Sequence, residues 1–450
     1  MFKKNSYNTD IFPNDSVTCI SPWDTIRILP DGSVKYCDAS GESFGQLNEH
    51  KNYLDWWQNS PHVQEVRSSM RKGMPIAGCS RCYHAEKIDS VSFRTRRNFQ
   101  SAIHHGKFFR NSLEQSPIWP RMKKDQVAGM PAFVSVSFNN TCNSRCIMCL
   151  PKYSNLVSED YFDFGLLSSV NHQNDWTVLD PNKLRYQNLL DLVVKNHRLL
   201  YLKINGGEPF IDKSSQQFLS DIVESGKTDF NLTINTNGTV WNQSIVENIL
   251  KLESCIIDFG IETASDANNY IRFGSKIEEI LSMIMRYQQC TDHQHQLILH
   301  SVPQALSMLT FDTLIDFCYQ NNLYLMGNPL YNPRYFSIDC LPLDIKTKLV
   351  NRWKQKYHIT NEDLLSSVDH VSQTNITKDF STDTNKSFLP GYLKDMVIKV
   401  MKNLLLPEPS DIVQLQKQLI SHAVKFDQKH GTNFVLTFPE LSDLYYRYKL

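Results

Sequence analysis

Three regularly spaced cysteines, Cys142, Cys146 and Cys149, are the residues of this chain whose types and spacing point most clearly to chemistry. Cysteine thiolates hold iron–sulfur clusters, and a cubane of four irons ordinarily takes four of them. A loop that supplies only three leaves one iron open to a further ligand, as a catalytic zinc site keeps one open position. The C-x3-C-x2-C spacing therefore predicts a four-iron cluster with one open corner. Three buried thiols or a zinc loop are the simpler alternatives.

Four further cysteines precede this loop, namely Cys19, Cys37, Cys79 and Cys82. The last two form a C-x-x-C pair, and all four together could make a site with four thiolate ligands. Zinc and a four-iron cluster both accept four sulfurs, so both remain open, although the spacing alone favours zinc. The cysteines without ligand spacing are Cys255, Cys290, Cys318 and Cys340.

The elements that would position these residues alternate between strands and helices from residue 132 to residue 330. The expected strands are 132–138, 199–205, 230–236, 255–261, 296–302 and 323–328. Apolar residues between them recur every three or four positions, as on the buried side of a helix, most clearly in 186–194, 277–284 and 311–318. Six such repeats predict a parallel sheet with helices outside it. In such folds the functional residues gather at the carboxyl ends of the strands.

Polar and glycine-rich segments do follow these strands. The cysteine loop comes after the first strand, and Gly206, Gly207, Glu208 and Pro209 come after the second. Glycine lets a backbone approach a ligand closely, and a glutamate can accept hydrogen bonds from an ammonium group. Taken alone, this segment could also be a plain β-turn. Candidate residues after the later strands are Asn235, Asn237, Glu262, Arg272, His300, Ser301 and Gln304.

The cysteine loop resembles the signature of the radical S-adenosylmethionine (SAM) enzymes, since Cys142, Cys146 and Cys149 match its three catalytic cysteines one for one. The resemblance implies that the open iron of a [4Fe–4S] cluster chelates the amino and carboxylate groups of SAM. An electron from the cluster then cleaves the sulfonium bond and yields a 5′-deoxyadenosyl radical. Met148 stands where the family usually carries an aromatic or large apolar residue beside the adenine.

Further segments resemble motifs of the same family. Residues 206–209 resemble its GGEP motif, which holds the amino group of SAM, and residues 235–239 resemble its T-N-G segment near SAM. Arg272 matches a Y-I-R-x-G motif and could pair with the SAM carboxylate. Gly260 and Glu262 stand where relatives typically have serine and aspartate, which leaves a ribose or carboxylate contact there open. The resemblance implies an α/β fold with a partial (β/α)6 radical SAM barrel.

The first unit, residues 13–100, resembles the twitch or SPASM-type auxiliary-cluster module of these enzymes, here placed before the core. This resemblance favours an iron–sulfur cluster over zinc at the four N-terminal cysteines, for electron transfer or for structure. Alternating residues around Asp31 and Gly32 predict a β-hairpin in this small α+β domain. We expect a linker at 101–131, the radical SAM core at 132–330 and a helical region at 331–450.

The composition of the chain limits the cellular compartment and the binding partners that we expect. The 450-residue chain has no formal net charge and a pI of about 7.2, so no overall field favours nucleic acid or an anionic membrane. The neutral charge and the lack of an evident RNA-binding module disfavour an RNA-modifying enzyme. We expect no signal peptide and no membrane span, because the required apolar runs are missing. A cytoplasmic protein with an external reductant such as flavodoxin or ferredoxin is the expectation.

The expected function is reductive cleavage of SAM followed by abstraction of a substrate hydrogen. An auxiliary cluster would favour oxidative modification, and a peptide or protein is the expected substrate. The insertion at 151–183 and the C-terminal region could build an extended groove for it. No leader-peptide-binding domain is evident, so oxidation of a small sugar or cyclitol-like metabolite stays open. The departures at Gly260 and Glu262 keep a third alternative open, a non-catalytic iron–sulfur or zinc-binding scaffold.

Overall fold

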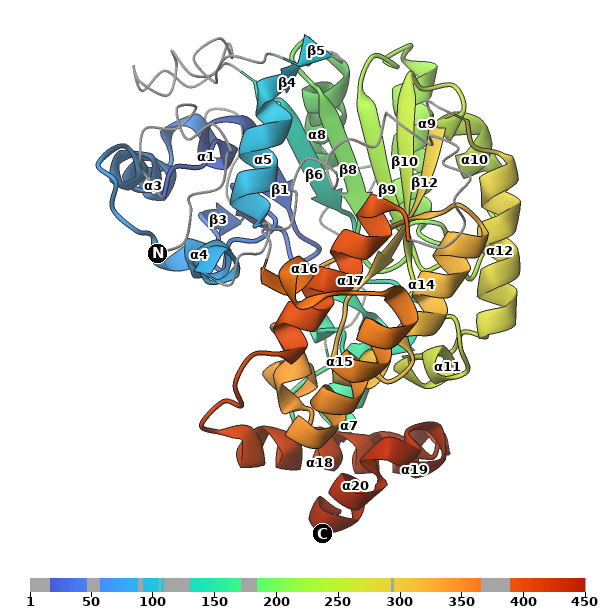
Figure 1. Ribbon diagram of the computed structural model, residues 1–450. Coiled ribbons are helices and arrows are strands. Elements are labelled where there is room, and N and C mark those ends of the chain that lie inside the picture. Colours follow the sequence, from blue (N-terminus) through green and yellow to red (C-terminus); the bar gives the residue numbers. More distant parts are fainter. Residues whose placement is uncertain are drawn as a thin grey trace.

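The structure, a computed structural model, describes residues 17–46, 57–87, 92–104, 107–108, 130–170, 184–292, 295–365 and 389–449. Its centre is a twisted sheet with helices beside it (Figure 1). Six strands lie in one row, and each pairs in parallel with its neighbours. They are β6 Phe133–Ser137, β8 Tyr201–Asn205, β9 Asn231–Thr236, β10 Ser254–Gly260, β12 His295–Ser301 and β13 Tyr324–Gly327. The six strands expected from the sequence are therefore confirmed.

The sheet continues past β6 into the N-terminal unit. The added strands are β1 Thr25–Ile28, β2 Ser33–Lys35 and β3 Gly45–Gln46. β1 pairs in parallel with β6, with Ile28 opposite Val136, and the predicted hairpin is the antiparallel pair β1–β2. Among the described residues the strand order is β13-β12-β10-β9-β8-β6-β1-β2-β3. One sheet thus connects the segments that carry the two groups of cysteines, which the sequence pattern did not reveal.

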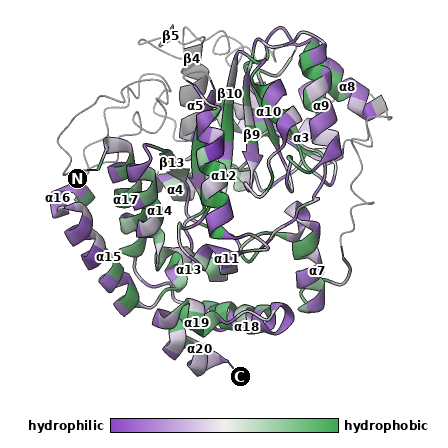
Figure 2. Ribbon diagram, turned by 90° about the vertical axis from the view of Figure 1, so that its right-hand side faces the viewer, coloured by the Kyte–Doolittle hydropathy of each residue, from purple (hydrophilic) through white to green (hydrophobic). Residues whose placement is uncertain are grey.

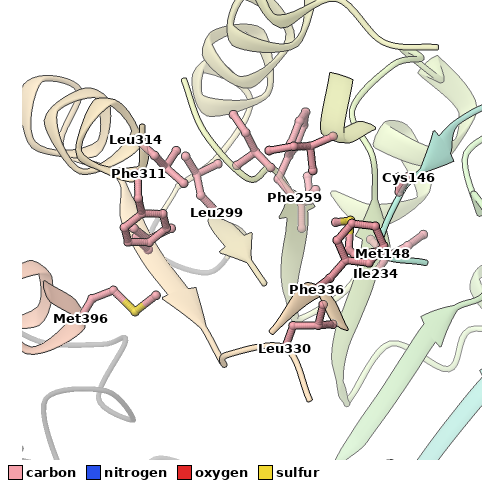
Figure 3. Close-up of a cluster of buried hydrophobic side chains, with 14 of the residues drawn as sticks. Cys146, Met148, Ile234, Phe259, Leu299, Phe311, Leu314, Leu330, Phe336 and Met396 are labelled. Carbon is pink, nitrogen blue, oxygen red and sulfur yellow. The ribbon is translucent and has the colours of Figure 1, made fainter. Parts of the chain in front are cut away.

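The two faces of the parallel strands differ, because successive side chains of a strand point to opposite faces. On one face Phe259 of β10 meets Tyr287 of the helix α12 (Ile277–Gln289), with ring centroids 5.9 Å apart. Figure 3 shows part of the buried apolar cluster to which Phe259 and Leu299 belong. The neighbouring positions of the same strands place polar side chains on the other face, the inner face: Lys203, Asn235, Asp258 and His300.

Helices follow the strands as predicted. They are α8 Leu184–Val194, α9 Lys213–Glu224, α10 Gln243–Ile249, α11 Ala267–Ile271, α12 Ile277–Gln289, α13 Ala305–Met308 and α14 Phe311–Gln320. Asp212 caps α9 by accepting hydrogen bonds from two backbone amides, and Asn242 caps α10 in the same way. Such caps pair backbone donors that a helix start leaves open, and here they fix the loops after β8 and β9.

The remaining elements lie before, beside and after this sheet. The N-terminal helices are α1 Ser21–Asp24, α3 Pro61–Arg71, η3 Ala77–Cys79, α4 Ser80–Lys87 and α5 Phe93–Ala102, followed by the strands β4 Ile103–His104 and β5 Lys107–Phe108. After β6 come β7 Arg145–Cys146, η5 Pro151–Tyr153, α7 Asn155–Asp163 and, after α11, β11 Arg272–Phe273.

The C-terminal region is helical, as expected. Its elements are η7 Arg334–Phe336, η8 Ile338–Cys340, α15 Leu343–Tyr357, α16 Asn361–Leu365, α17 Gly391–Leu404, α18 Ile412–His430, α19 Phe434–Thr437, η9 Pro439–Leu441 and α20 Ser442–Tyr448. Figure 2 shows that α15 is largely hydrophilic, whereas β10 is largely hydrophobic. None of the helices in the described part of the chain has the length and apolar character that a membrane crossing needs.

These observations confirm an α/β fold with a large, mostly parallel sheet. The partial (β/α)6 barrel geometry and the domain limits stay predictions. Parts of the expected segments lie outside the described residues. They are 13–16, 47–56 and 88–91 of the first unit, 105–106 and 109–129 of the linker, 171–183 of the insertion, 293–294 of the core, and 366–388 and 450 of the C-terminal region.

Candidate functional site

The three-cysteine loop follows β6 and is held at both ends by residues distant in the sequence. β7 pairs with β11 in a small antiparallel sheet, which sets Cys146 directly opposite Arg272. At the start of the loop the amide of Cys142 donates a hydrogen bond to Oδ1 of Asn155, 2.9 Å away. These contacts fix the backbone of the loop on both sides of Asn143 and Ser144.

The sulfurs of this loop are free thiols in a buried setting. Burial raises the pKa of Cys142 to about 12 and also raises the pKa values of Cys146 and Cys149. Metals bind the thiolate, so loading this loop must release protons. Met148 is buried in the cluster that Figure 3 shows, together with Cys146.

Glu208 is buried where the loops after β8 and β9 meet. Its carboxylate accepts hydrogen bonds from the amide of Phe210 at 3.0 Å, the hydroxyl of Thr236 at 2.8 Å and the amide of Asn237 at 2.6 Å. Burial raises the pKa of Glu208 to about 7, although these hydrogen bonds act in the opposite direction. A carboxylate has about four acceptor positions, so one remains for a further donor such as an ammonium group.

The two glycines before Glu208 allow a very close backbone contact. A β-carbon on Gly207 would lie 1.9 Å from the carbonyl oxygen of Thr141, and Gly206 has a φ of +140°. The segment thus packs directly on the residues that precede Cys142, and the amide of Glu208 donates a 2.7 Å hydrogen bond to that same carbonyl. Pro209, the last residue of the segment, is buried.

Polar atoms without partners lie beside the cysteine loop. The side-chain amide of Asn140 and the hydroxyl of Thr141 are buried and have no hydrogen-bond partner among the described residues. Such orphaned groups are costly unless something satisfies them. Their place immediately before Cys142 fits a site that takes a polar ligand.

The structure separates the two asparagines after β9. The side-chain amide of Asn237 donates to Oδ1 of Asn143 at 2.8 Å and lies 3.9 Å from the sulfur of Cys142, so it belongs to the cysteine loop. Asn235 faces the other way and donates to Asp258 on the inner face at 2.7 Å. Its own Oδ1 is buried without a partner in the described part of the chain.

Glu262 and Arg272 pair with each other. The guanidinium of Arg272 donates to Oε1 of Glu262 at 3.0 Å, while Oε2 accepts from the hydroxyl of Ser301 and the amide of Val302. Burial alone would lower the pKa of Arg272, but the neighbouring Cys146 and Glu262 outweigh it and raise that pKa. Both oxygens of Glu262 are therefore used within the protein, and Arg272 is fixed beside the cysteine loop.

Polar residues of the inner face form a hydrogen-bonded row, of which the sequence analysis named Asn235 and His300 but not Asp258. Asp258 accepts from Asn235 on one side and lies 3.1 Å from Nδ1 of His300 on the other. Burial works against the charge on Asp258, but His300 and the other partners lower its pKa, so an ionised Asp258 makes Nδ1 the donor. Polar residues at alternate positions of strands were the signal in the sequence.

The four N-terminal cysteines surround a cavity. Cys19, Cys37, Cys79 and Cys82 line a space of about 340 Å³, part of it open to solvent, together with Tyr36 and Arg94. Burial raises the pKa of Cys19 to about 11 and that of Cys79 to about 12. The structure thus brings Cys19 and Cys37 together with the distant C-x-x-C pair Cys79 and Cys82.

The four cysteines line one common space, so all of them can reach a group bound there. Their donor set suits either zinc or a four-iron cluster, because both accept four sulfur ligands. The resemblance of this unit to an auxiliary-cluster module favours the iron–sulfur cluster.

Comparison with known families agrees with this interpretation. Residues 19–83, which include all four of these cysteines, match the SPASM model, described as an iron–sulfur cluster-binding domain. None of the curated proteins matches the chain.

Solved structures with partial similarity include native anSMEcpe with bound AdoMet (13% identity, 52% of this chain and 61% of that chain, TM-score 0.36). Streptococcus suis SuiB bound to S-adenosylmethionine is 15% identical over 65% of this chain and 59% of that chain, with a TM-score of 0.34. TYW1 with a lysine–pyruvate adduct is 14% identical over 52% of this chain and 77% of that chain, with a TM-score of 0.29. The chain covers about three fifths of the first two. TM-scores this low do not by themselves establish a common fold.

The N-terminal unit is thus assigned by a family model, and its sheet is continuous with that of a second cysteine site. That second site combines a three-cysteine loop, a glycine contact that admits no side chain and a glutamate with an acceptor position to spare. Residues 19–83 belong to the SPASM family of iron–sulfur cluster-binding domains.

Proposed function

We propose that this protein is an enzyme that cleaves SAM reductively at the three-cysteine loop and abstracts a hydrogen atom from a substrate. Cys142, Cys146 and Cys149 would hold a four-iron cluster with one iron open to SAM. When bound, the cluster and SAM supply the electron and the 5′-deoxyadenosyl radical. The residues of the chain bind, orient and shield these groups.

One observation carries this proposal: the start of the three-cysteine loop, at Thr141, packs against Gly207 and Glu208. The acceptor position left on Glu208 suits the ammonium group of SAM. The unpartnered polar atoms of Asn140 and Thr141 offer further hydrogen bonds next to it. Glu208, Asn237 and Arg272 are the residues we assign to SAM binding, with Met148 beside the adenine.

Gly260 and Glu262, which stand where relatives typically have serine and aspartate, fit together with Arg272. A β-carbon on Gly260 would lie 3.0 Å from Nη2 of Arg272, so glycine makes room for the guanidinium. Glu262 then fixes that guanidinium at 3.0 Å. The two unusual residues therefore support one another, which favours a working site over a degenerate scaffold. The proposed ribose contact by Glu262 loses support, because its side chain has no exposed area.

We further propose a peptide or protein as substrate, modified by oxidation. The helix α7 of the insertion and the helix α18 of the C-terminal region lie against each other beside the cysteine loop. Lys425 donates a 2.7 Å hydrogen bond to the carbonyl of Phe164, and Lys429 lies 2.8 Å from Asp160. The two segments expected to shape an extended groove are thus joined. The four-cysteine site would exchange an electron with the substrate site.

A small polar metabolite such as a sugar or cyclitol is the second candidate, and the inner face favours it. Lys203, Asn235, Asp258 and His300 offer a cation, an amide, a carboxylate and an imidazole on adjacent strands. Hydroxyl groups of a substrate could pair with such side chains. We place His300 on the substrate side in either case, because Asp258 orients its ring.

The first test is SAM cleavage by protein reconstituted anaerobically with iron and sulfide. With dithionite and SAM we expect 5′-deoxyadenosine from the wild type and none from Cys146→Ala, which should also lose about four iron atoms. Cys290→Ser is the matched control, because Cys290 is half-buried and lacks ligand spacing. Loaded wild-type protein that yields no 5′-deoxyadenosine would support the scaffold alternative.

The second test separates the two substrates. Deuterated peptides and deuterated sugars are offered to the active enzyme, and deuterium is traced into 5′-deoxyadenosine. Transfer from a peptide supports our first candidate, and transfer from a sugar alone supports the second.

A further inference from the structure

Each of the two cysteine sites contains one buried arginine held by one glutamate. Arg272 and Glu262 lie at the three-cysteine loop, with side chains 13% and 0% exposed. Arg94 and Glu86 lie at the four-cysteine cavity, with side chains 11% and 21% exposed. The two pairs come from different segments of the chain, yet each places a cation beside a group of cysteines. Thiolate ligands bring negative charge into a buried place, and a fixed cation offsets it.

The pair at the three-cysteine loop has a definite orientation. The backbone of Arg272 lies directly opposite Cys146, so the arginine belongs to the small sheet that holds the loop. Glu262 comes from the segment after β10 and is tied to Ser301 and Val302 beyond β12. The positive end of the pair therefore adjoins the loop, and the negative end is anchored in the body of the protein.

The guanidinium has little freedom to move. It lies on Gly260, where a β-carbon would come within 3.0 to 3.4 Å of three of its atoms. On its other side Glu262 accepts its hydrogen bond, and no solvent reaches the glutamate. A charge fixed in a dry place acts strongly on its neighbours, because water cannot reorient to screen it.

A fixed cation near a redox centre stabilises the reduced, more negative form. Iron–sulfur clusters respond to local charge in this way, and their potentials span a wide range for that reason. Loss of the cation should make reduction harder, whereas loss of the glutamate should leave the cation uncompensated and make reduction easier. The two halves of one ion pair should therefore act in opposite directions.

We propose that Arg272 is a fixed counter-charge that raises the reduction potential of the cluster held by Cys142, Cys146 and Cys149, and that Glu262 is its positioning residue and tempers its effect. This inference rests on the proposed function, since it needs a cluster at that loop. It goes beyond a contact between Arg272 and SAM, because it applies before SAM is bound.

The test is a redox titration of the reconstituted full chain without SAM, followed by electron paramagnetic resonance. The signal of the three-cysteine site is the one that Cys146→Ala removes. For Arg272→Gln we expect the equilibrium constant of reduction to fall about tenfold, which is about 59 mV for one electron. Glu262→Gln should move the same potential upward. Arg272→Lys keeps the charge and should restore most of the wild-type value.

Arg94→Gln is the matched control, because it removes a buried arginine from the other site and should leave this signal in place. Gly260→Ala is a second probe that keeps both charges and only displaces the guanidinium, so a smaller downward shift is expected. Potentials that stay unchanged in folded, iron-loaded Arg272→Gln and Gly260→Ala, or that move the same way in Arg272→Gln and Glu262→Gln, overturn the inference alone. Absence of iron from the three cysteines of the wild type overturns the proposed function as well.

Discussion

The backbone amide of Asn237 donates a 2.6 Å hydrogen bond to the carboxylate of Glu208, and this bond joins the loop after β9 to the loop after β8. The side chain of the same asparagine reaches Asn143 in the cysteine loop. Three loops at the carboxyl ends of neighbouring strands are thus tied together through one buried glutamate. The glutamate of the GGEP-like segment is therefore a structural centre as well as a candidate ligand for SAM.

The burial of Glu208 predicts a pH-dependent stability of the cofactor-free protein. Its pKa is about 7 in the folded chain and near its ordinary value of 4.5 in the unfolded chain. Between these values the folded state binds a proton that the unfolded state does not, so stability falls as pH rises. The fall should be about 3 kcal/mol at most. Urea unfolding from pH 5 to pH 8 measures it.

In Glu208→Gln the side chain no longer titrates, so the free energy of unfolding should lose most of its dependence on pH. Glu224→Gln on the exposed side of α9 serves as the control and should keep it. A slope that survives in Glu208→Gln would assign the pH dependence to other groups.

The contact at Gly207 predicts a large cost for the smallest possible side chain. In Gly207→Ala the new methyl group would lie 1.9 Å from the carbonyl oxygen of Thr141, and neither partner is a flexible side chain. The backbone must shift, which should cost about 3 kcal/mol and lower the iron content. In Gly391→Ala nothing lies within 4 Å of the new methyl group, so its stability should change by less than about 1 kcal/mol. Thermal unfolding and iron analysis distinguish the two.

The six parallel strands and their alternation with helices follow from local sequence signals. Apolar residues on one side of each strand, such as Phe259 and Leu299, must be covered by helices, and this requirement alone predicts the alternation that the structure shows. The cysteine loop and the segment around Glu208 could be placed because each directly follows such a strand. These predictions depend only on residues close together in the chain.

Other features of the site depend on contacts between residues that are far apart in the sequence. Nothing near Cys146 indicates that Arg272 lies opposite it, because the pairing of β7 with β11 joins segments more than a hundred residues apart. Nothing around Thr25 indicates that β1 extends the parallel sheet at β6. Asn235 seemed equivalent to Asn237 in the sequence, yet β9 ends at Thr236, so Asn237 turns to Asn143 in the cysteine loop while Asn235 bonds to Asp258. Tertiary contacts determine the partner of Cys146, the position of β1 and the directions of the two asparagine side chains.

Asp160 should be critical for the position of the C-terminal helix α18. Its carboxylate is 3% exposed and lies 2.6 Å from Arg145, the residue before Cys146, and 2.8 Å from Lys429 of α18. Asp160→Asn leaves two cations without a buried partner, so it should destabilise the protein by about 3 kcal/mol. Asp163→Asn is the matched control: Asp163 also pairs with Lys429 but is half exposed, and its loss should cost less than about 1 kcal/mol. Chemical unfolding compares them, and equal costs would contradict the role of Asp160.

Because His300 lies on the inner face, we expect its loss to slow the conversion of substrate but not the cleavage of SAM. His300 bonds to Asp258, and the part of the chain that the structure describes shows no bond from His300 to the cysteine loop. His300→Asn should therefore keep wild-type iron content and cleave SAM without substrate at a rate within about twofold of the wild type. Product formation from the peptide or sugar that the wild type consumes should fall about a hundredfold, since an oriented imidazole acts as an acid or base.

Asp258→Asn should change the two rates in the same way as His300→Asn, because it removes the carboxylate that orients the ring. His358→Asn, an exposed histidine at the end of α15, should change neither rate. Equal losses of SAM cleavage and product formation in His300→Asn would instead place this histidine among the residues that hold the fold.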